Sequence, residues 1–496
     1  MRVLMISPEV TPFAQTGGLG EVLSGLPAEL VALGLQVDVL MPRYRGINLE
    51  LHRIKPLDLK VEIDMNANKV VARFWEFLDE RGVRYLFLEN ERYFDREGLY
   101  GTRYKDYEDN AERFVFLTRA AIEMALARPT PYEIFHAHEW QAALTPVYLR
   151  TLFAGEPLLR DSASVMTIHN LGYQGIFGHQ DMPLVGLGWE FFNYRQMEFH
   201  GQLNFLKSGI VFADKVNTVS PSYREEILSE EFGFGLEGVL QEKGAHLSGI
   251  LNGVDYNVWN PATDPHIAAN YDPDDLSGKA ICKANLQRIA DLPVRPDVPV
   301  IGVVSRLSPQ KGIDMLQDAI PSLVGQGLQL VVLGTGEPQH HDALLELGRT
   351  YLDNTAIFLS YDQDLAHKIF AGSDMILVPS RYEPCGLNQL YALKYGTAPV
   401  VRATGGLNDT VEEFDGDWDR GTGFKFVQAN PKALEQTVFK AARLYREDLQ
   451  AWKRLMIRCM NQDFSWKRSA LAYKELYEKA LQERQRVLNP RFGGPE

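Results

Sequence analysis

Short apolar runs alternate along the chain with segments in which apolar residues recur every three or four positions. The short runs are typical of buried parallel strands, and the periodic segments are typical of the helices that connect them. The pattern therefore predicts an α/β chain built on parallel sheets. The expected strands are residues 3–6, 37–40, 85–88, 134–136, 164–168, 215–218, 300–305, 328–333, 356–359, 375–378 and 399–402.

Two stretches depart from this alternation. Between residues 48 and 80 apolar and polar residues alternate one by one, which predicts a β-hairpin. From residue 431 to 486 the helical period continues over long segments, so the chain is expected to end in helices. The helical pattern of residues 21–33 contains Pro27, which is expected to kink that helix.

The length of the chain predicts more than one domain, because 496 residues exceed what a single hydrophobic core ordinarily supports. Turn residues at 252–255 mark the join. We expect an N-terminal domain at 1–247, a C-terminal domain at 248–463, and a helix within 464–496 that packs back on the N-terminal domain and ends in a frayed tail. The fold class that follows is two Rossmann-like, doubly wound α/β domains.

Composition excludes several classes of protein. With 45% hydrophobic and 23% charged residues the chain is globular, and its net charge of −14 disfavours nucleic acid or an anionic membrane as a partner. No apolar run approaches the roughly 18 residues of a membrane span. The three cysteines are far apart, which fits a reducing cytoplasm. The pattern of the N-terminal residues predicts a strand and not a signal peptide.

Two glycine-rich turns repeat the same motif. Thr16-Gly17-Gly18-Leu19 and Thr404-Gly405-Gly406-Leu407 each follow a predicted strand and precede a helix. Such a turn lets backbone N–H groups approach an anion or a sugar oxygen, although an ordinary tight turn explains each motif equally well. The dinucleotide spacing G-x-G-x-x-G is absent. Two similar domains with glycine turns suggest a ligand held in the cleft between them.

Charged residues follow two strands of the second half. Arg306 and Lys311 flank a loop after the strand at 300–305, and this pair suits a diphosphate group, whose leaving charge it would stabilise. Glu383 and Cys385 follow the strand at 375–378, before a helix. Glu383 is a carboxylate at the mouth of the expected cleft, whereas Cys385 has no base spaced to activate it and reads as a packing residue. The alternative for Arg306 and Lys311 is a solvated loop.

Three motifs admit a metal or a sugar. Three histidines, His136, His138 and His169, are spaced so that they could ligate zinc, as in a metal hydrolase. That hypothesis gives no role to the basic loop at 306–311. Trp140 and Tyr173 read either as sugar-stacking faces or as core aromatics. The acidic run at 415–419 fails as a calcium loop, because the glycine and the glutamate of an EF-hand are missing, and it reads as solvated.

Together these segments resemble the bacterial glycogen synthase family, in order and from Met1 to about Tyr477. Each motif is weak alone, and their number carries the resemblance. The matching segments are residues 16–22, 136–140, 167–171, 251–255, 305–312, 378–387, 404–407 and 463–466.

The resemblance implies a glycosyltransferase-B architecture with a deep interdomain cleft. It implies transfer of glucose from ADP-glucose to the non-reducing end of an α-1,4-glucan such as glycogen, with retention and with neither metal nor cofactor. Arg306 and Lys311 would bind the diphosphate, His169 and Glu383 would act on the glucosyl unit, and these four are the implied catalytic residues. The other implied donor-binding residues are Gln15, Gly17, Gly18, Glu21, Asn170, Asn252, Tyr361, Cys385, Gly386, Leu387, Thr404 and Gly405, and the implied acceptor-binding residues are Glu139 and Trp140.

Three positions depart from the family pattern. Gln15 stands where the family usually has lysine, so this side chain supplies no charge. Glu21 and Glu139 replace the usual aspartates. The departures leave two other hypotheses: a retaining transferase that uses UDP-glucose or a small sugar acceptor, and a non-catalytic glucan-binding protein. Oligomeric state does not follow from the sequence.

Overall fold

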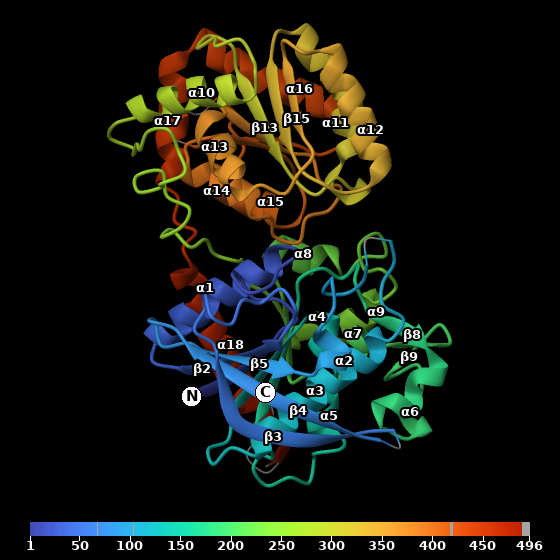
Figure 1. Ribbon diagram of the computed structural model, residues 1–496. Coiled ribbons are helices and arrows are strands. Elements are labelled where there is room, and N and C mark those ends of the chain that lie inside the picture. The colour runs from blue at the N-terminus through green and yellow to red at the C-terminus, as the bar shows by residue number, and fades with distance from the viewer. Residues whose placement is uncertain (67, 103, 417–419, 489–496) are drawn as a thin grey trace. The chain divides into compact units, whose positions relative to one another are not determined.

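The computed structural model describes residues 1–66, 68–102, 104–416 and 420–488 (Figure 1). Residue contacts divide the chain into two compact units. The first unit comprises Met1–Val219, Arg224–Gly253 and the chain from Trp466 onward, and the second comprises Ser220–Tyr223 and Val254–Ser465. Residues 417–419 of the acidic run and the tail at 489–496 lie outside the described residues.

The first unit is built on a nine-stranded sheet in which β1 lies between β2 and β6. All neighbours pair in parallel except β3–β4 and β4–β5, which are antiparallel. In sheet order the strands are β12 (Leu247–Gly249), β11 (Lys215–Thr218), β7 (Ala163–Ile168), β6 (Ile134–His138), β1 (Arg2–Ile6), β2 (Gln36–Pro42), β5 (Arg84–Glu89), β4 (Asn68–Leu78) and β3 (Lys55–Met65). A small sheet adds β8 (Ile176–Gly178), β10 (Gln202–Asn204) and β9 (Glu198–Phe199).

Helices cover this sheet, and the last helix of the chain is one of them. In Figure 1 the red α18 lies among the blue and cyan elements of the first unit, and it packs against α1 and β7. The helices are α1 (Gly18–Ala32), α2 (Glu91–Phe94), α3 (Asn110–Leu126), α4 (Glu139–Ala142), α5 (Leu144–Arg150), α6 (Met182–Val185), α7 (Phe205–Phe212), α8 (Pro221–Glu226), α9 (Glu237–Lys243) and α18 (Trp466–Leu488), of which α8 spans both units.

The second unit is a six-stranded parallel sheet in which β13 lies between β14 and β16. In sheet order its strands are β15 (Thr355–Phe358), β14 (Gln329–Leu333), β13 (Val300–Val304), β16 (Met375–Val378), β17 (Ala398–Arg402) and β18 (Phe424–Phe426). Its helices are α10 (Ser277–Ile289), α11 (Ile313–Gly325), α12 (Pro338–Thr350), α13 (Gln363–Gly372), α14 (Asn388–Lys394), α15 (Gly405–Thr410), α16 (Pro431–Glu447) and α17 (Leu449–Met460), and the single-turn η4 (Pro309–Lys311) precedes α11.

The structure confirms the predicted α/β class: the sheet of the second unit is parallel throughout, and that of the first is parallel except at β3–β4 and β4–β5. Each expected strand is present, and the hairpin is β3–β4. The strand β1 shows why strands could be predicted from apolar runs: Val3–Ile6 is apolar and wholly buried. The strands of the small sheet, β12 and β18 were not predicted, because two or three residues are too few to show a period. Helix α1 continues past Pro27 to Ala32.

Within the described residues, no helix is both long enough and apolar enough to cross a lipid bilayer. All three cysteines lie in this part of the chain, and each is a buried thiol that forms no disulfide. Burial raises the pKa of the Cys459 thiol to about 12, which keeps it protonated.

Candidate functional site

The carboxyl ends of the central strands define a candidate edge in each unit. In an open parallel sheet, ligands bind where the strand order reverses. In the first unit the order reverses between β1 and β6, and in the second between β13 and β16. The loops after these four strands carry most of the residues singled out from the sequence.

In the first unit a buried carboxylate holds the glycine-rich turn. Glu9, three residues after β1, is 4% exposed. Its Oε2 accepts the backbone N–H groups of Thr16 at 2.6 Å and Gly17 at 3.3 Å, and its Oε1 accepts the Thr16 hydroxyl at 2.7 Å and the Tyr100 hydroxyl at 2.6 Å. Two amides that the sequence offered to an anion or a sugar are therefore used inside the protein.

A second buried carboxylate organises the loop after β7. Glu139 begins α4 directly after β6 and takes a left-handed backbone conformation with φ of 63°. Its Oε1 accepts the backbone N–H groups of His169 at 2.6 Å and Asn170 at 2.9 Å. Burial raises the pKa of Glu139 to about 8, against the lowering effect of these amides. A strained non-glycine residue with a shifted pKa is a mark of a functional site.

The three histidines lie side by side, with ring centroids 3.9 Å apart for His136 and His138 and 5.3 Å apart for His138 and His169. The Nδ1 of His138 lies 3.0 Å from the Nε2 of His169, and His136 bonds to Thr167 at 2.6 Å and to the Tyr477 hydroxyl at 2.8 Å. Burial lowers the pKa of His169 to about 3 and holds the pKa values of His136 and His138 well below the usual range. The described residues contain no cluster of three or more His, Cys, Asp or Glu side chains arranged to hold a metal ion.

The tautomer of His136 follows from its partners. The Thr167 hydroxyl donates to the Asn217 side-chain oxygen at 2.6 Å, so its oxygen accepts the proton on Nε2 of His136. Nδ1 of His136 then accepts the Tyr477 hydroxyl. A second proton on this ring would displace an existing hydrogen bond in a wholly buried site.

The two aromatic residues that were interpreted as sugar-stacking or core residues differ in their surroundings. Trp140 is partly buried, with ring centroids 5.0 Å from Phe114 and 5.5 Å from Phe177. Gly175 lies against its face, since a Cβ there would come within 2.4 Å of the indole. Tyr173, in contrast, is 50% exposed. Most contacts of Trp140 are therefore those of a core aromatic residue, which was one of the two interpretations that the sequence left open.

Three further predicted donor residues lie in the first unit. Gln15 precedes the turn, accepts the Thr11 hydroxyl through its side-chain oxygen, and packs beneath Gly20 of α1. Glu21 is a partly buried residue in the first turn of α1. Asn252 is buried, and its side-chain oxygen has no hydrogen-bond partner among the residues that the structure describes.

In the second unit the structure brings the predicted cation and carboxylate together. Lys311, at the end of η4, donates through Nζ to Oε2 of Glu383 at 2.6 Å, and the Ser380 hydroxyl donates to the same oxygen at 2.7 Å. Glu383 is 6% exposed, whereas Arg306 is an exposed residue of the loop after β13. The conformation after Lys311 needs glycine, because Gly312 has φ of 67° and a Cβ would meet the Pro379 carbonyl oxygen at 2.2 Å.

The second glycine-rich turn packs on the Glu383 loop. The backbone N–H of Gly406 donates to the Glu383 carbonyl at 3.1 Å, and a Cβ on Gly405 would lie 2.0 Å from that oxygen. Thr404, Gly405 and Cys385 are buried, and Gly386 and Leu387 are partly buried before α14. Tyr361, three residues past β15, is 74% exposed. Most of the predicted residues of this half thus lie on adjacent loops at one edge of the sheet.

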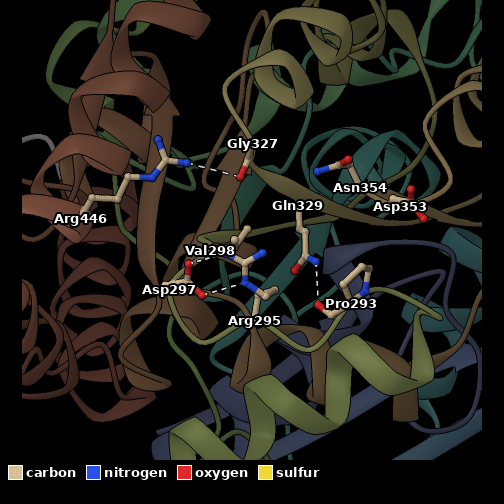
Figure 2. A pocket seen from close by; sticks show the side chains of 9 residues that line it. All are labelled: Pro293, Arg295, Asp297, Val298, Gly327, Gln329, Asp353, Asn354 and Arg446. Carbon is tan, nitrogen blue, oxygen red and sulfur yellow. Dashed lines mark hydrogen bonds and ion pairs between the residues drawn. The ribbon is translucent and has the colours of Figure 1, made fainter.

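The second unit also contains a pocket of about 430 Å³ away from this edge (Figure 2). It lies beside the first residue of β14 and before β13, at the opposite ends of the strands. Its arginines are already engaged: Arg295 pairs with Asp297 at 2.6 Å, and Arg446 donates to the Gln326 carbonyl at 2.8 Å. None of the predicted site residues lines it. The lining residues are Pro293, Arg295, Asp297, Val298, Gly327, Gln329, Asp353, Asn354 and Arg446.

The sequence analysis missed three residues of these edges. Glu9 follows β1 closely, so its place after a central strand was a usable signal. Ser380 belongs to the same sequence motif as Glu383, but it was not singled out as a site residue. Tyr100 gave no signal, because it reaches Glu9 from a loop 91 positions away.

Two family models match the chain. The model described as "Starch synthase catalytic domain" matches residues 2–242, and the model described as "Glycosyl transferases group 1" matches residues 287–454. With the two doubly wound sheets, these matches define a glycosyltransferase of the glycosyltransferase-B fold.

Individual relatives narrow the class. A "Glycogen synthase" of Anaeromyxobacter sp. (strain Fw109-5) is 47% identical over 478 residues, which cover 96% of this chain and 99% of that protein. A "Glycogen synthase" of Koribacter versatilis is 46% identical, covering 98% and 99%. The catalytic domain of starch synthase IV from Arabidopsis thaliana, bound to ADP and acarbose, is similar with a TM-score of 0.90, 32% identity, and coverage of 97% and 99%. The chain belongs to the glycogen synthase family.

Proposed function

We propose that this protein transfers glucose from ADP-glucose to the non-reducing end of an α-1,4-glucan, with retention of configuration and without a metal ion. The observation that carries the proposal is the Lys311–Glu383 pair at the strand-order reversal of the second unit. Membership of the glycogen synthase family and the ADP bound in the similar starch synthase support the choice of donor. We also propose that it acts in the cytoplasm, with residues 1–247 as the acceptor-side domain, which also contributes residues to the donor, and residues 248–463 as the nucleotide-sugar domain.

The proposed chemistry assigns each charged group a task. Arg306 and Lys311 bind the diphosphate and stabilise the negative charge that develops on the leaving ADP. Glu383 accepts hydrogen bonds from hydroxyls of the glucosyl unit, and His169 and Asn170 contact the same sugar. The leaving phosphate takes the proton of the attacking glucan hydroxyl on the same face of the sugar. The new glycosidic bond therefore keeps the configuration of the old one.

The remaining residues position these groups. Glu139 acts through the two amides that it holds, and so sets the place of His169 and Asn170. Trp140 and Tyr173 serve the glucan side, and exposed Tyr361 serves the adenine. The N–H groups around Gly386, together with the turns at 16–18 and 404–405, complete the donor site. Cys385 supplies packing, because it is buried.

The test is transfer of labelled glucose to glycogen from ADP-glucose and, separately, from UDP-glucose, both in EDTA. Wild type, Gln15→Lys and Glu383→Gln are compared. We expect transfer from ADP-glucose in EDTA and a large loss of turnover in Glu383→Gln. A clear preference for UDP-glucose would reject the proposed donor. A wild type that binds glycogen but transfers from neither donor would be a binding protein, and Gln15→Lys would show whether residue 15 is the cause.

A further inference from the structure

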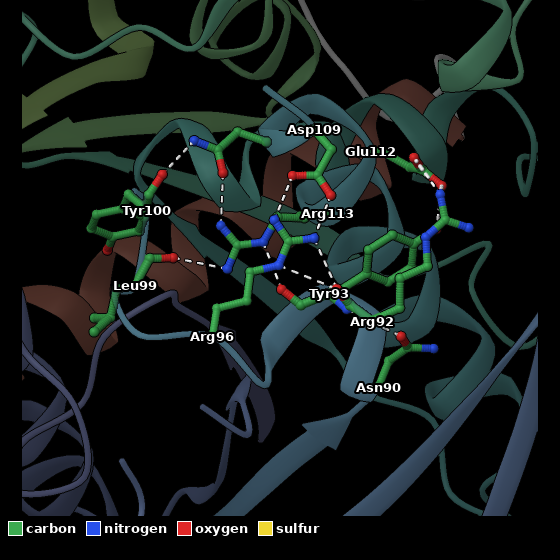
Figure 3. A network of polar contacts seen from close by, with 10 residues as sticks. Asn90, Arg92, Tyr93, Arg96, Leu99, Tyr100, Asp109, Glu112 and Arg113 are labelled. Carbon is green, nitrogen blue, oxygen red and sulfur yellow. Dashed lines mark hydrogen bonds and ion pairs between the residues drawn. The ribbon is translucent and has the colours of Figure 1, made fainter. Parts of the chain in front are cut away.

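A buried guanidinium fixes the loop that carries Tyr100 (Figure 3). Arg113 of α3 is fully buried and donates to the Leu99 carbonyl at 2.8 Å and to the Asn110 side-chain oxygen at 2.7 Å. The Asn110 amide in turn donates to the Tyr100 carbonyl at 2.8 Å. Because the carbonyls of Leu99 and Tyr100 are both held, the backbone at Tyr100 has one defined position.

Because its backbone is held in place, Tyr100 also restrains the Glu9 carboxylate. Its hydroxyl donates to Oε1 of Glu9, and burial, followed by the charge of Glu9, holds the pKa of Tyr100 well above its usual value. The phenol therefore remains a donor at neutral pH. A carboxylate has about four acceptor positions, and four donors reach Glu9: two hydroxyls and two amides.

The glycine-rich turn depends on this carboxylate for its shape. Gly17 is the N-cap of α1 and has an extended backbone. Because it is a glycine, it has no side chain with which to cap the helix. Glu9 instead accepts the amides of Thr16 and Gly17, the two residues just before α1, and so fixes the path by which the chain enters the helix. Removing Glu9 would leave both amides without that acceptor and free the turn to adopt other conformations.

We propose that Glu9 and Tyr100 are positioning residues for the nucleotide sugar: together they fix the turn at 16–17, and so the first-turn amides of α1 beyond it, in the geometry that receives the donor. This inference rests on the proposed function, which assigns Gly17 and Gly18 to the donor. The proposed function assigns the glucan side to Trp140 and Tyr173, and not to the turn at 16–17 that Glu9 and Tyr100 hold. Loss of the pair should therefore affect the donor and not the glucan.

The experiment measures donor and glucan KM separately, with ADP binding by calorimetry and the free energy of unfolding for each variant. Tyr100→Phe removes one hydrogen bond to Glu9 and should raise the donor KM about 2- to 10-fold. Glu9→Ala removes the acceptor of both amides and should raise it roughly 5- to 100-fold. Glu9→Gln keeps an oxygen for the amides and should restore most of that loss. The glucan KM should stay within about 2-fold throughout.

Tyr132→Phe is the matched control. Tyr132 is also a buried phenol, and it donates to the carboxylate of Asp38. It lies just before β6, at the amino ends of the strands, whereas Glu9 follows the carboxyl end of β1. We expect it to lose comparable stability with an unchanged donor KM. Equal kinetic profiles for Tyr100→Phe and Tyr132→Phe, or equal rises in donor and glucan KM, would overturn the positioning role.

The two proposals fail differently. An active wild type with an unchanged donor KM in Tyr100→Phe rejects the positioning role and leaves the proposed function standing. A wild type that transfers no glucose but binds ADP, more weakly in Tyr100→Phe, rejects the function and supports the positioning role. A wild type that neither transfers glucose nor binds ADP overturns both. If Glu9→Ala does not fold, Tyr100→Phe still decides the outcome.

Discussion

The contact between Lys311 and Glu383 indicates a functional site that neither residue indicates alone. They are 72 positions apart, and each alone could be a surface charge. Paired at 2.6 Å, with Glu383 nearly buried and Ser380 on the same oxygen, they form a charge-assisted pair that either bound phosphate or bound sugar would contact.

Replacing Lys311 tests this pair. We expect Lys311→Ala to weaken donor binding by about 1.5–3 kcal/mol, the range for a lost hydrogen bond to a charged group. Glu383→Ala should lower kcat far more than it lowers the free energy of unfolding. Lys368→Ala is the control, because Lys368 pairs with a half-exposed Asp364 in α13 and should leave kinetics unchanged. Near-normal turnover in Glu383→Ala would remove its assigned role.

The buried histidines make stability depend on pH. His136 is neutral in the fold because its pKa lies well below the ordinary value, so its stabilising contribution is complete above about pH 6.5. As the pH falls below that value the unfolded chain takes up the proton first. Each such histidine then removes up to about 1.4 kcal/mol per pH unit.

Urea unfolding at pH 7.5, 6.0 and 5.0 measures this slope. His136→Asn should lower stability at every pH but flatten its fall below pH 6.5. His179→Asn, at an exposed position, should leave the slope as in wild type. Glu139 acts in the opposite sense: its pKa is raised to about 8, so its contribution is present below about pH 4.5 and is lost as the pH rises through 8. An unchanged slope in His136→Asn would contradict the neutral ring.

At the scale of elements, close helix packing explains a glycine that local propensity disfavours. Gly25 lies inside α1, where glycine costs about 1 kcal/mol relative to alanine. A Cβ at this position would lie 2.0 Å from the indole nitrogen of Trp466 in α18, which is itself buried. The absent side chain therefore lets the two helices meet.

Gly25→Ala should consequently destabilise the protein by about 1–3 kcal/mol through overpacking, despite the better helix former. Gly238→Ala is the matched control, because Gly238 is also helical and a Cβ there meets nothing within 4 Å. We expect Gly238→Ala to be neutral or to stabilise by up to about 1 kcal/mol. Chemical denaturation of both variants measures the difference, and equal effects would show that the α1–α18 contact relaxes.

At the scale of the whole molecule, the chain returns to its first unit at the end. After Ser465 closes the second unit, α18 supplies the first unit with buried Trp466, Tyr473 and Tyr477. Tyr473 accepts the Asn217 amide at 3.1 Å, and Tyr477 reaches His136. The first unit is therefore completed only after the whole second unit has been synthesised.

A chain that stops at Ser465 should lose the fold of its first unit. Each aromatic residue of α18 buries about 150–250 Å², worth roughly 4–6 kcal/mol, so the three together contribute at least as much as the whole stability of a typical domain. Limited proteolysis should then cut within residues 1–253 first. A chain that stops at Leu488 keeps all of α18 and should resist cleavage as wild type does. Equal resistance of both shortened chains would contradict this account.

The sequence by itself determined the strands, the helices and the local motifs. The apolar runs that became β1 and β13, and the glycine motifs at the starts of α1 and α15, depend on neighbours along the chain, so burial period and turn chemistry suffice to find them. The candidate residues Arg306, Lys311 and Glu383 were found in the same way, from their places after strands.

Only the tertiary structure decided which of these segments meet. Strand order, the Lys311–Glu383 contact, the hold of Glu9 on the glycine turn and the return of α18 all join residues far apart in sequence. Such contacts depend on how whole sheets and helices pack, and no local period encodes that packing. The amides of Thr16 and Gly17 illustrate the reason: the sequence shows two donors, and only the fold shows that Glu9 already accepts from them.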